Sequence, residues 1–341
     1  MPGLLLDTLN GMRSSQVPLW LMRQAGRYLP EYRELRASKG GFLAMAYDSE
    51  AACEITLQPI DRFSFDGAIP FSDILIVPHA LGQNLEFLAG EGPRLSPKLV
   101  DSSLDALTRD PSRYEPIYET VRLCRKRLPE GVTMLGFAGS PWTVATYMVA
   151  GEGSRDQHEA RALAYRDPGA LQAIIDTIAE QTITYLSGQI EAGAEAVQLF
   201  DSWAGSLAPD EFERWVIAPN ARIVAALAEM HPDTPVIGFP KGSGEKLPAY
   251  ARETGVKAVG VDETLDPAWV ARELPAGMAV QGNLDPLLLL AGSNQLEKRV
   301  QTILEAFADR PHVFNLGHGI DRRTPIAHVE RLIAAVRGWQ G

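Results

Sequence analysis

Short apolar runs alternate with longer amphipathic stretches along most of the chain. Each run is almost continuously apolar and is bounded by Gly, Pro, Asp or Ser, which is typical of strands buried on both faces of a parallel sheet. The pattern predicts seven strands, at residues 66–71, 132–137, 195–200, 235–239, 257–262, 278–283 and 312–317. Residues 75–80 are the candidate for an eighth strand.

The stretches between these runs carry helix signals. The pattern predicts helices over about 167–192, 209–230 and 324–339, each with a proline in its first turn. Pro219 is expected to end or kink the second of these helices, because proline lacks the amide donor that a helix interior needs. Residues 81–99 are rich in Gly and Pro and predict an excursion such as a hairpin.

Strands that alternate with helices build βαβ units and a parallel sheet. Seven or eight such units favour a (β/α)8 barrel of the TIM type, as one domain over residues 1–341, rather than a two-domain doubly wound protein. The active site of such a barrel lies at the C-terminal ends of its strands. The candidates that follow the predicted strands are Ser72, Asp73, Ser140, Trp142, Asp201, Ser202, Trp203, Lys241, Asp262, Asn283, Asp285 and His318.

Charge and cysteine content reduce the number of possible partners, sites and locations. The formal net charge is −11, which disfavours a nucleic-acid or membrane-surface partner, although a local arginine cluster can still attract an anionic small molecule. The chain has two cysteines, Cys53 and Cys124, without metal-ligand spacing, so a disulfide framework and a structural zinc site are not expected. The first residues lack a signal-peptide pattern, and no segment approaches 18 consecutive apolar residues, so the expected location is the cytoplasm.

The strongest local signal is the stretch PLWLMRQAGRYLPEYRELR at residues 18–36. Arg23 and Arg27 either share one helical face or flank a tight loop at Gly26, and in both arrangements their guanidinium groups suit a carboxylate or phosphate. The alternative is a solvated basic helix face paired with Glu31 and Glu34. The stretch is unlike a P-loop, because it has neither the Gly-rich run nor the GK[ST] ending.

Four other residues allow a structural or a functional interpretation. Asp73 lies in the apolar stretch GAIPFSDIL, where an aspartate is costly unless it is paired or used; it is otherwise a helix cap or the partner of a loop arginine. Tyr147, in GFAGSPWTVATYMVAGEGS, either directs its hydroxyl into the mouth of the barrel, which is the space at the C-terminal ends of its strands, or is a core aromatic. Ser202, in QLFDSWAG, is a contact or a cap. His318 lies between two glycines that permit close approach of a ligand, or is structural.

Several familiar catalytic motifs are missing from the sequence. It contains no GxSxG, no HExxH and no GxGxxG after a predicted strand, and its six histidines are scattered without metal spacing. These observations disfavour a serine hydrolase, a zinc enzyme and a Rossmann dehydrogenase.

Seven stretches together resemble the uroporphyrinogen decarboxylase family: PLWLMRQAGRYLPEYR, PFSDIL, GFAGSPWTVATYMVAG, QLFDSWAG, FPKG, QGNLDP and FNLGHGI. They occur in the family's order and cover about residues 4 to 339. The first and third are highly specific, whereas the shorter ones are individually weak. The resemblance implies a (β/α) barrel with a deep cleft, a homodimer, and no metal or organic cofactor. The implied reaction converts the four acetate side chains of uroporphyrinogen III to methyl groups, giving coproporphyrinogen III in haem and chlorophyll-type synthesis.

The resemblance also implies roles for individual residues. It makes Asp73 the aspartate that faces the four pyrrole N–H groups at the centre of the cleft, and it makes Asp73, Arg23 and Arg27 the catalytic set. The implied substrate-binding residues are Arg23, Gln24, Ala25, Gly26, Arg27, Asp73, Tyr147, Ser202 and His318. No metal-binding residue is implied. Trp203 stands at a rim position where some relatives carry a different residue.

This chemistry suits the residues. Protonation of the pyrrole carbon next to an acetate gives the departing electrons a sink, and the anionic Asp73 stabilises the positive ring. Arg23 and Arg27 anchor the reacting acetate. The proton donor is either Tyr147 or a water ordered by Arg27.

Two alternative functions remain: a methyltransferase on a related barrel with a zinc site, and a tetrapyrrole carrier without activity. The FPKG loop and the absence of a cysteine near a histidine argue against the first.

Overall fold

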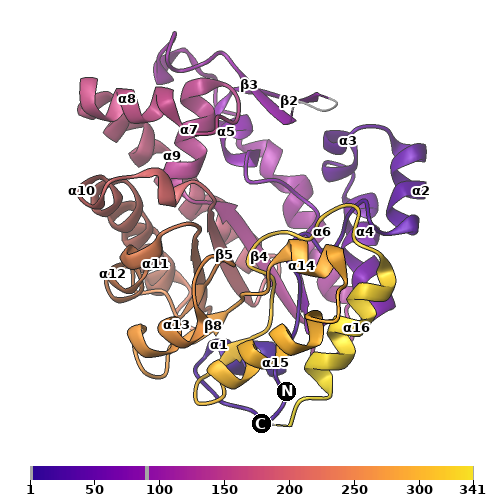
Figure 1. Ribbon diagram of the computed structural model, residues 1–341. Coiled ribbons are helices and arrows are strands. Elements are labelled where there is room, and N and C mark those ends of the chain that lie inside the picture. Colours follow the sequence, from indigo (N-terminus) through magenta and orange to yellow (C-terminus); the bar gives the residue numbers. More distant parts are fainter. Residues whose placement is uncertain (1–2, 89–91, 341) are drawn as a thin grey trace.

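A parallel sheet surrounded by helices makes up the computed structural model, which describes residues 3–88 and 92–340 (Figure 1). All seven predicted strands form, and each pairs in parallel with the next one along the chain, so the βαβ interpretation is confirmed. The strands are β1 (Gly67–Ala68), β4 (Thr133–Gly139), β5 (Ala196–Asp201), β6 (Val236–Pro240), β7 (Ala258–Gly260), β8 (Ala279–Gln281) and β9 (His312–Val313).

The predicted strand at residues 75–80 is wrong, because Ile76–Leu81 form the helix α5. The carboxylate of Asp73 accepts a hydrogen bond from the amide of Leu75 at 2.9 Å, which turns the chain toward a helix immediately before these apolar residues. A short apolar run therefore fits a buried helix as well as a strand, and here the turn decides.

The place between β9 and β1 is taken by residues 18–20, near the start of the chain. The amide of Phe314 donates to the carbonyl of Pro18 at 2.8 Å, and the amide of Asp66 donates to the carbonyl of Leu19 at 2.9 Å. The amide of Leu19 in turn donates to the carboxylate of Asp66. Residues 18–20 thus join the two edges of the sheet and close the barrel.

Helices cover the outside of the sheet (Figure 1). Their bounds are α1 (Leu4–Leu9), α2 (Pro30–Lys39), α3 (Phe42–Ala46), α4 (Ser49–Phe63), α6 (Glu115–Arg127), α7 (Pro141–Ala150), α8 (His158–Arg166), α9 (Pro168–Glu191), α10 (Pro209–Phe212), α11 (Ala218–Met230), α12 (Leu247–Glu253), α13 (Pro267–Glu273), α14 (Pro286–Ala291), α15 (Leu296–Ala306) and α16 (Ile326–Arg337). Short 3₁₀ turns occupy Leu104–Ala106, Pro111–Tyr114, Ala204–Ser206 and Gly244–Lys246.

The predicted helices and the hairpin are confirmed with small changes. α9 begins after Asp167, whose carboxylate caps the amide of Ala170 at 2.9 Å. The helix at 209–230 is divided into α10, a π-helical turn at Glu213–Ile217 and α11, so the kink comes just before Pro219. The excursion at 81–99 contains the antiparallel strands β2 (Asn84–Leu88) and β3 (Gly92–Ser96), whose connecting residues lie outside the described ranges.

Polar side chains join the interior of the barrel across the sheet. Trp20, which is fully buried, donates from its indole nitrogen to Gln281 of β8 at 2.9 Å. Gln281 donates to Gln198 of β5 at 3.1 Å. Because buried polar groups must be paired, this chain of bonds fixes the segment at residues 18–20 relative to β8 and β5.

Gln189 of α9 ties its helix to the backbone of β4. Its side-chain amide accepts from the amide of Phe137 at 3.0 Å and donates to the carbonyl of the same residue at 2.9 Å. All of these atoms are buried, so truncation leaves two backbone groups without partners.

We therefore expect Gln189→Ala to lower the free energy of unfolding by about 2–4 kcal/mol, as measured by urea denaturation followed by circular dichroism. Gln172→Ala on the same helix is the matched control, because the Gln172 amide only reaches the neighbouring Asp176 at 3.2 Å. That control should lose about 0.5 kcal/mol or less. Equal losses in the two variants would contradict the role of Gln189.

Candidate active site

The arginine-rich segment forms a loop between the barrel-closing residues and α2, and its position is set by Gln24. The buried side chain of Gln24 accepts from the amide of Leu21 at 3.0 Å and donates to the carbonyl of Gly67 in β1 at 2.8 Å. On the other side, the amide of Met22 donates to the side chain of Asn315, just after β9, at 3.0 Å. The loop is therefore held by both strands that flank the closure of the barrel.

Arg23 and Arg27 flank Gly26 in this loop, so the helical-face arrangement is wrong for them. Arg23 has a φ of 62°, a left-handed conformation that is unusual for a residue with a side chain. Both side chains are exposed, and neither forms an ion pair with a carboxylate of the described residues. Glu31 pairs instead with Arg62 at 2.8 Å. Two guanidinium groups thus remain available to an anionic ligand.

Asp73 is both a capping residue and a charged group at the candidate site. One of its oxygens accepts the amide of Leu75, which is the capping role. Burial raises the pKa of its carboxyl to about 6, while this hydrogen bond and the charge of Arg23 limit the rise. The arginine loop is bonded to β1 through Gln24, and Asp73 follows the same strand, so the loop and Asp73 are neighbours.

Tyr147 and His318 lie around the same space. Burial raises the pKa of Tyr147, which also senses the charges of Asp73 and Arg23. Burial lowers the pKa of His318 to about 4, and Arg23 and Lys241 add to the effect. A Cβ placed on Gly319 would lie only 2.4 Å from Cδ of Arg23, so the segment of His318 packs directly against that arginine.

Ser202 lies in the turn after β5, at the same end of the sheet, but no contact joins its side chain to the residues above. Its neighbour Trp203 does reach the cluster, with its ring centroid 6.5 Å from that of Tyr147. The amide of Trp203 donates to the hydroxyl of Thr143 at 3.0 Å, and this hydroxyl donates to the buried Asp201. The turn and α7 are therefore held together beneath the mouth.

Asp201 and Lys241 are two neighbours of the site to which the sequence assigned no role. Burial raises the pKa of Asp201 to about 7, and its hydrogen bonds with Thr143 and Asn220 limit the rise. Lys241 follows β6 and influences His318, as described above. Both residues follow predicted strands, but this position did not distinguish them from the many other candidates at strand ends.

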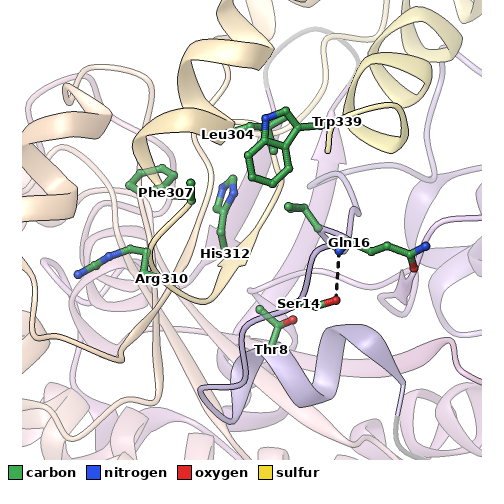
Figure 2. A pocket seen from close by; sticks show the side chains of 10 residues that line it. Thr8, Ser14, Gln16, Leu304, Phe307, Arg310, His312 and Trp339 are labelled. Carbon is green, nitrogen blue, oxygen red and sulfur yellow. Dashed lines mark hydrogen bonds between the residues drawn. The ribbon is translucent and has the colours of Figure 1, made fainter. Parts of the chain in front are cut away.

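Figure 2 shows a small cavity at the opposite end of the barrel, beside His312, the first residue of β9. Its volume of about 10 Å³ has room for about one water molecule. It is lined by Thr8, Ser14, Gln16, Val17, Leu304, Phe307, Ala308, Arg310, His312 and Trp339. Residues at the N-terminal ends of barrel strands serve stability rather than catalysis, so this cavity is no active site.

Within residues 3–88 and 92–340, no three His, Cys, Asp or Glu side chains gather closely enough to hold a metal ion. Cys53 and Cys124 are both buried and free, in α4 and α6 on the outside of the sheet. In the same ranges, no helix has the length and apolar character required to cross a membrane.

Comparison with solved structures supports the barrel. A methyltransferase from Methanosarcina mazei superposes with a TM-score of 0.84 over 100% of both chains, at 18% sequence identity. A B12-independent methionine synthase from Shewanella sp. W3-18-1 superposes with a TM-score of 0.59 over 94% of this chain and 93% of that one, at 11% identity. At such low identity these likenesses concern the fold alone, and the TIM-type barrel is confirmed.

Comparison with sequences identifies the family. Residues 3–339 match the family model described as uroporphyrinogen decarboxylase. A uroporphyrinogen decarboxylase of Novosphingobium aromaticivorans is 71% identical, with 99% of each chain covered. Another, of Erythrobacter litoralis, is 72% identical over 100% of both chains. The chain belongs to the uroporphyrinogen decarboxylase family.

Proposed function

We propose that the residues gathered at the mouth are the centre at which this chain decarboxylates uroporphyrinogen III. The reaction converts four acetate side chains to methyl groups and releases CO2, giving coproporphyrinogen III; it is a carboxy-lyase reaction of tetrapyrrole biosynthesis, on the route to haem and chlorophyll. One observation carries the proposal: the loop of Arg23, which Gln24 ties to the carbonyl of Gly67 in β1, and Asp73, in the turn after β1, lie together at one end of the sheet.

The pyrrole ring supplies the electron sink for each decarboxylation. A proton adds to the ring carbon next to the acetate and makes the ring cationic. The bond to the carboxylate then breaks, CO2 leaves, and its electron pair neutralises the ring. A proton adds to the resulting methylene while the ring carbon loses the first one, so each CO2 consumes one proton in total. We propose that this cycle needs no metal or organic cofactor.

Asp73 serves this cycle as the anion beneath the ring. Leu75 occupies one of its carboxylate oxygens, so the other oxygen is free to accept pyrrole N–H groups. A carboxylate preorganised in a partly dry site stabilises the developing positive charge without further reorganisation.

The other residues bind and orient the substrate. The exposed guanidinium groups of Arg23 and Arg27 hold the reacting acetate, and the loop residues 24–26 approach it closely. With a pKa of about 4, His318 is neutral near pH 7 and acts as a hydrogen-bonding group rather than a cation. Burial raises the pKa of Tyr147, so its hydroxyl stays protonated and is able to donate or relay a proton. Ser202 contributes a hydroxyl from the turn after β5.

We further propose that the chain folds as one domain, acts in the cytoplasm and assembles as a homodimer. Support for these points comes from the family's character, the net charge of −11 and the two free thiols. Light scattering after gel filtration would give twice the mass of one chain for a dimer.

The activity is tested by incubating the metal-stripped protein with uroporphyrinogen III without oxygen, followed by oxidation and chromatography of the porphyrins. Products with seven down to four carboxylates would establish decarboxylation without a metal. Unchanged octacarboxylate from folded protein would favour a tetrapyrrole carrier, whereas recovery of activity on adding zinc would contradict the cofactor-free cycle.

Replacing the anion at the centre of the mouth should abolish most of the activity. Asp73→Asn is expected to lower turnover by about 10²–10³, the usual effect of removing one preorganised stabilising group. In the wild type, kcat/KM should fall as the pH drops below about 6, because a protonated Asp73 is a poor acceptor for pyrrole N–H groups. Initial rates from pH 5 to 8 measure both effects; near-normal turnover of the variant would sink the electrostatic role.

Stability provides the control for this variant. The folded-state pKa of Asp73, about 6, lies above the unfolded value of about 3.9, so the ionised carboxylate destabilises the fold at pH 7. This cost disappears below about pH 4, where both states are protonated. Asp73→Asn should therefore be more stable than the wild type by about 1–3 kcal/mol at pH 7, and equally stable at pH 3.5.

Crowding Arg23 should impair binding without unfolding the chain. A methyl group at Gly319 would lie 2.4 Å from Cδ and 2.8 Å from Cγ of Arg23, so Gly319→Ala must displace that side chain. We expect kcat/KM to fall about tenfold or more. Gly41→Ala is the control, because a Cβ there meets nothing within 4 Å. If the two variants have the same steady-state kinetics, the position of Arg23 is unimportant.

A further inference from the structure

Lys241 is fixed at the mouth by the loops on both sides of it. Its amide donates to the carbonyl of Asp201 at 3.0 Å, and its carbonyl accepts the amide of Gly205 at 3.0 Å. The next residue, Gly242, donates its amide to the carboxylate of Asp262 at 2.7 Å. The backbone that carries Lys241 is thus joined to the ends of β5 and β7.

The side chain of Lys241 is half-buried but forms no hydrogen bond or ion pair within the described ranges. The nearby carboxylate of Asp262 is already occupied by the amide of Gly242 and by the amide and hydroxyl of Thr264. Lys246, five residues on, behaves differently: its ammonium donates to the carbonyl of Leu207 at 2.7 Å and lies 5.0 Å from the ring of Phe212. One lysine of this segment supports the fold, whereas the other is left available.

Lys241 lies across the barrel from the arginine loop. β6 is the middle strand in the order of the sheet, whereas the arginine loop follows the segment that joins the two edge strands. In a closed barrel these positions lie opposite each other. Both cations lie at the C-terminal end of the sheet, because Lys241 directly follows β6 and the arginine loop is bonded to Asn315, just after β9.

We propose that Lys241 forms a second carboxylate subsite, which holds a propionate of the tetrapyrrole while an acetate reacts beside Arg23 and Arg27. The proposal rests on the proposed function above. Each pyrrole of the substrate carries one acetate and one propionate, and only the acetates are lost. A propionate is therefore the one side-chain carboxylate that the substrate, every intermediate and the product all present to a fixed cation.

The test uses three variants of the full chain. Lys241→Met removes the charge at nearly constant length, Lys241→Arg restores it, and Lys257→Met is the control, since Lys257 is exposed just before β7 at the opposite end of the sheet. Lys241→Met should raise KM for uroporphyrinogen III about tenfold, equivalent to about 1.4 kcal/mol, with kcat changed less than about threefold. Lys241→Arg should restore most of the affinity, and Lys257→Met should match the wild type.

Anaerobic binding of coproporphyrinogen III completes the test, because this product has propionates but no acetates. Lys241→Met should weaken its binding by the same factor as it raises KM. An unchanged KM, a raised KM with unchanged binding of coproporphyrinogen III, or an equal change in Lys257→Met would each overturn the proposal. Failure of the proposed function is distinguished by the wild type run in parallel, which would then release no CO2 even though binding is measurable.

Discussion

The closure of the barrel by residues 18–20 is the constraint on which the site depends. The sheet has two edges, at β1 and β9, and this short segment satisfies backbone groups of both. The chain then continues directly into the loop of Arg23 and Arg27, which Gln24 and Asn315 hold against the same two edges. The proposed catalytic loop is therefore positioned by the main-chain architecture of the barrel.

Around this loop the protein tolerates an electrostatic cost. Asp73 is kept in a partly dry place where ionisation is unfavourable, and the arginines beside it have no carboxylate partner of their own in the described part of the chain. Salt bridges abound elsewhere, on the outer helices, where water screens them. The arginines at the mouth are thus left without carboxylate partners in the described part of the chain, whereas charged side chains on the outer helices are paired.

The fold was largely predictable because apolar runs between Gly, Pro and Asp have few interpretations in an alternating α/β chain. The strand prediction for residues 75–80 was wrong, because a single hydrogen bond, from the amide of Leu75 to Asp73, turns the chain into a helix there. The segment that takes the eighth place could not be found, since one bridge to Phe314 and hydrogen bonds to Asp66 leave no strand periodicity in the sequence. Arg23, Asp73, Tyr147 and His318 were candidates from their local sequence, and the resemblance supplied their roles. The position of Lys241 could not be predicted, because it depends on which of its neighbours are already bonded.

The order of the strands also bears on how the chain is made. Residues 18–20 are among the first to leave the ribosome, but their partner Phe314 is among the last. During synthesis, the segment that completes the barrel must wait, with its backbone groups solvated, until nearly the whole chain has emerged. A nascent or prematurely ended chain would thus lack an assembled arginine loop, so the proposed porphyrinogen site would be complete only in a finished chain.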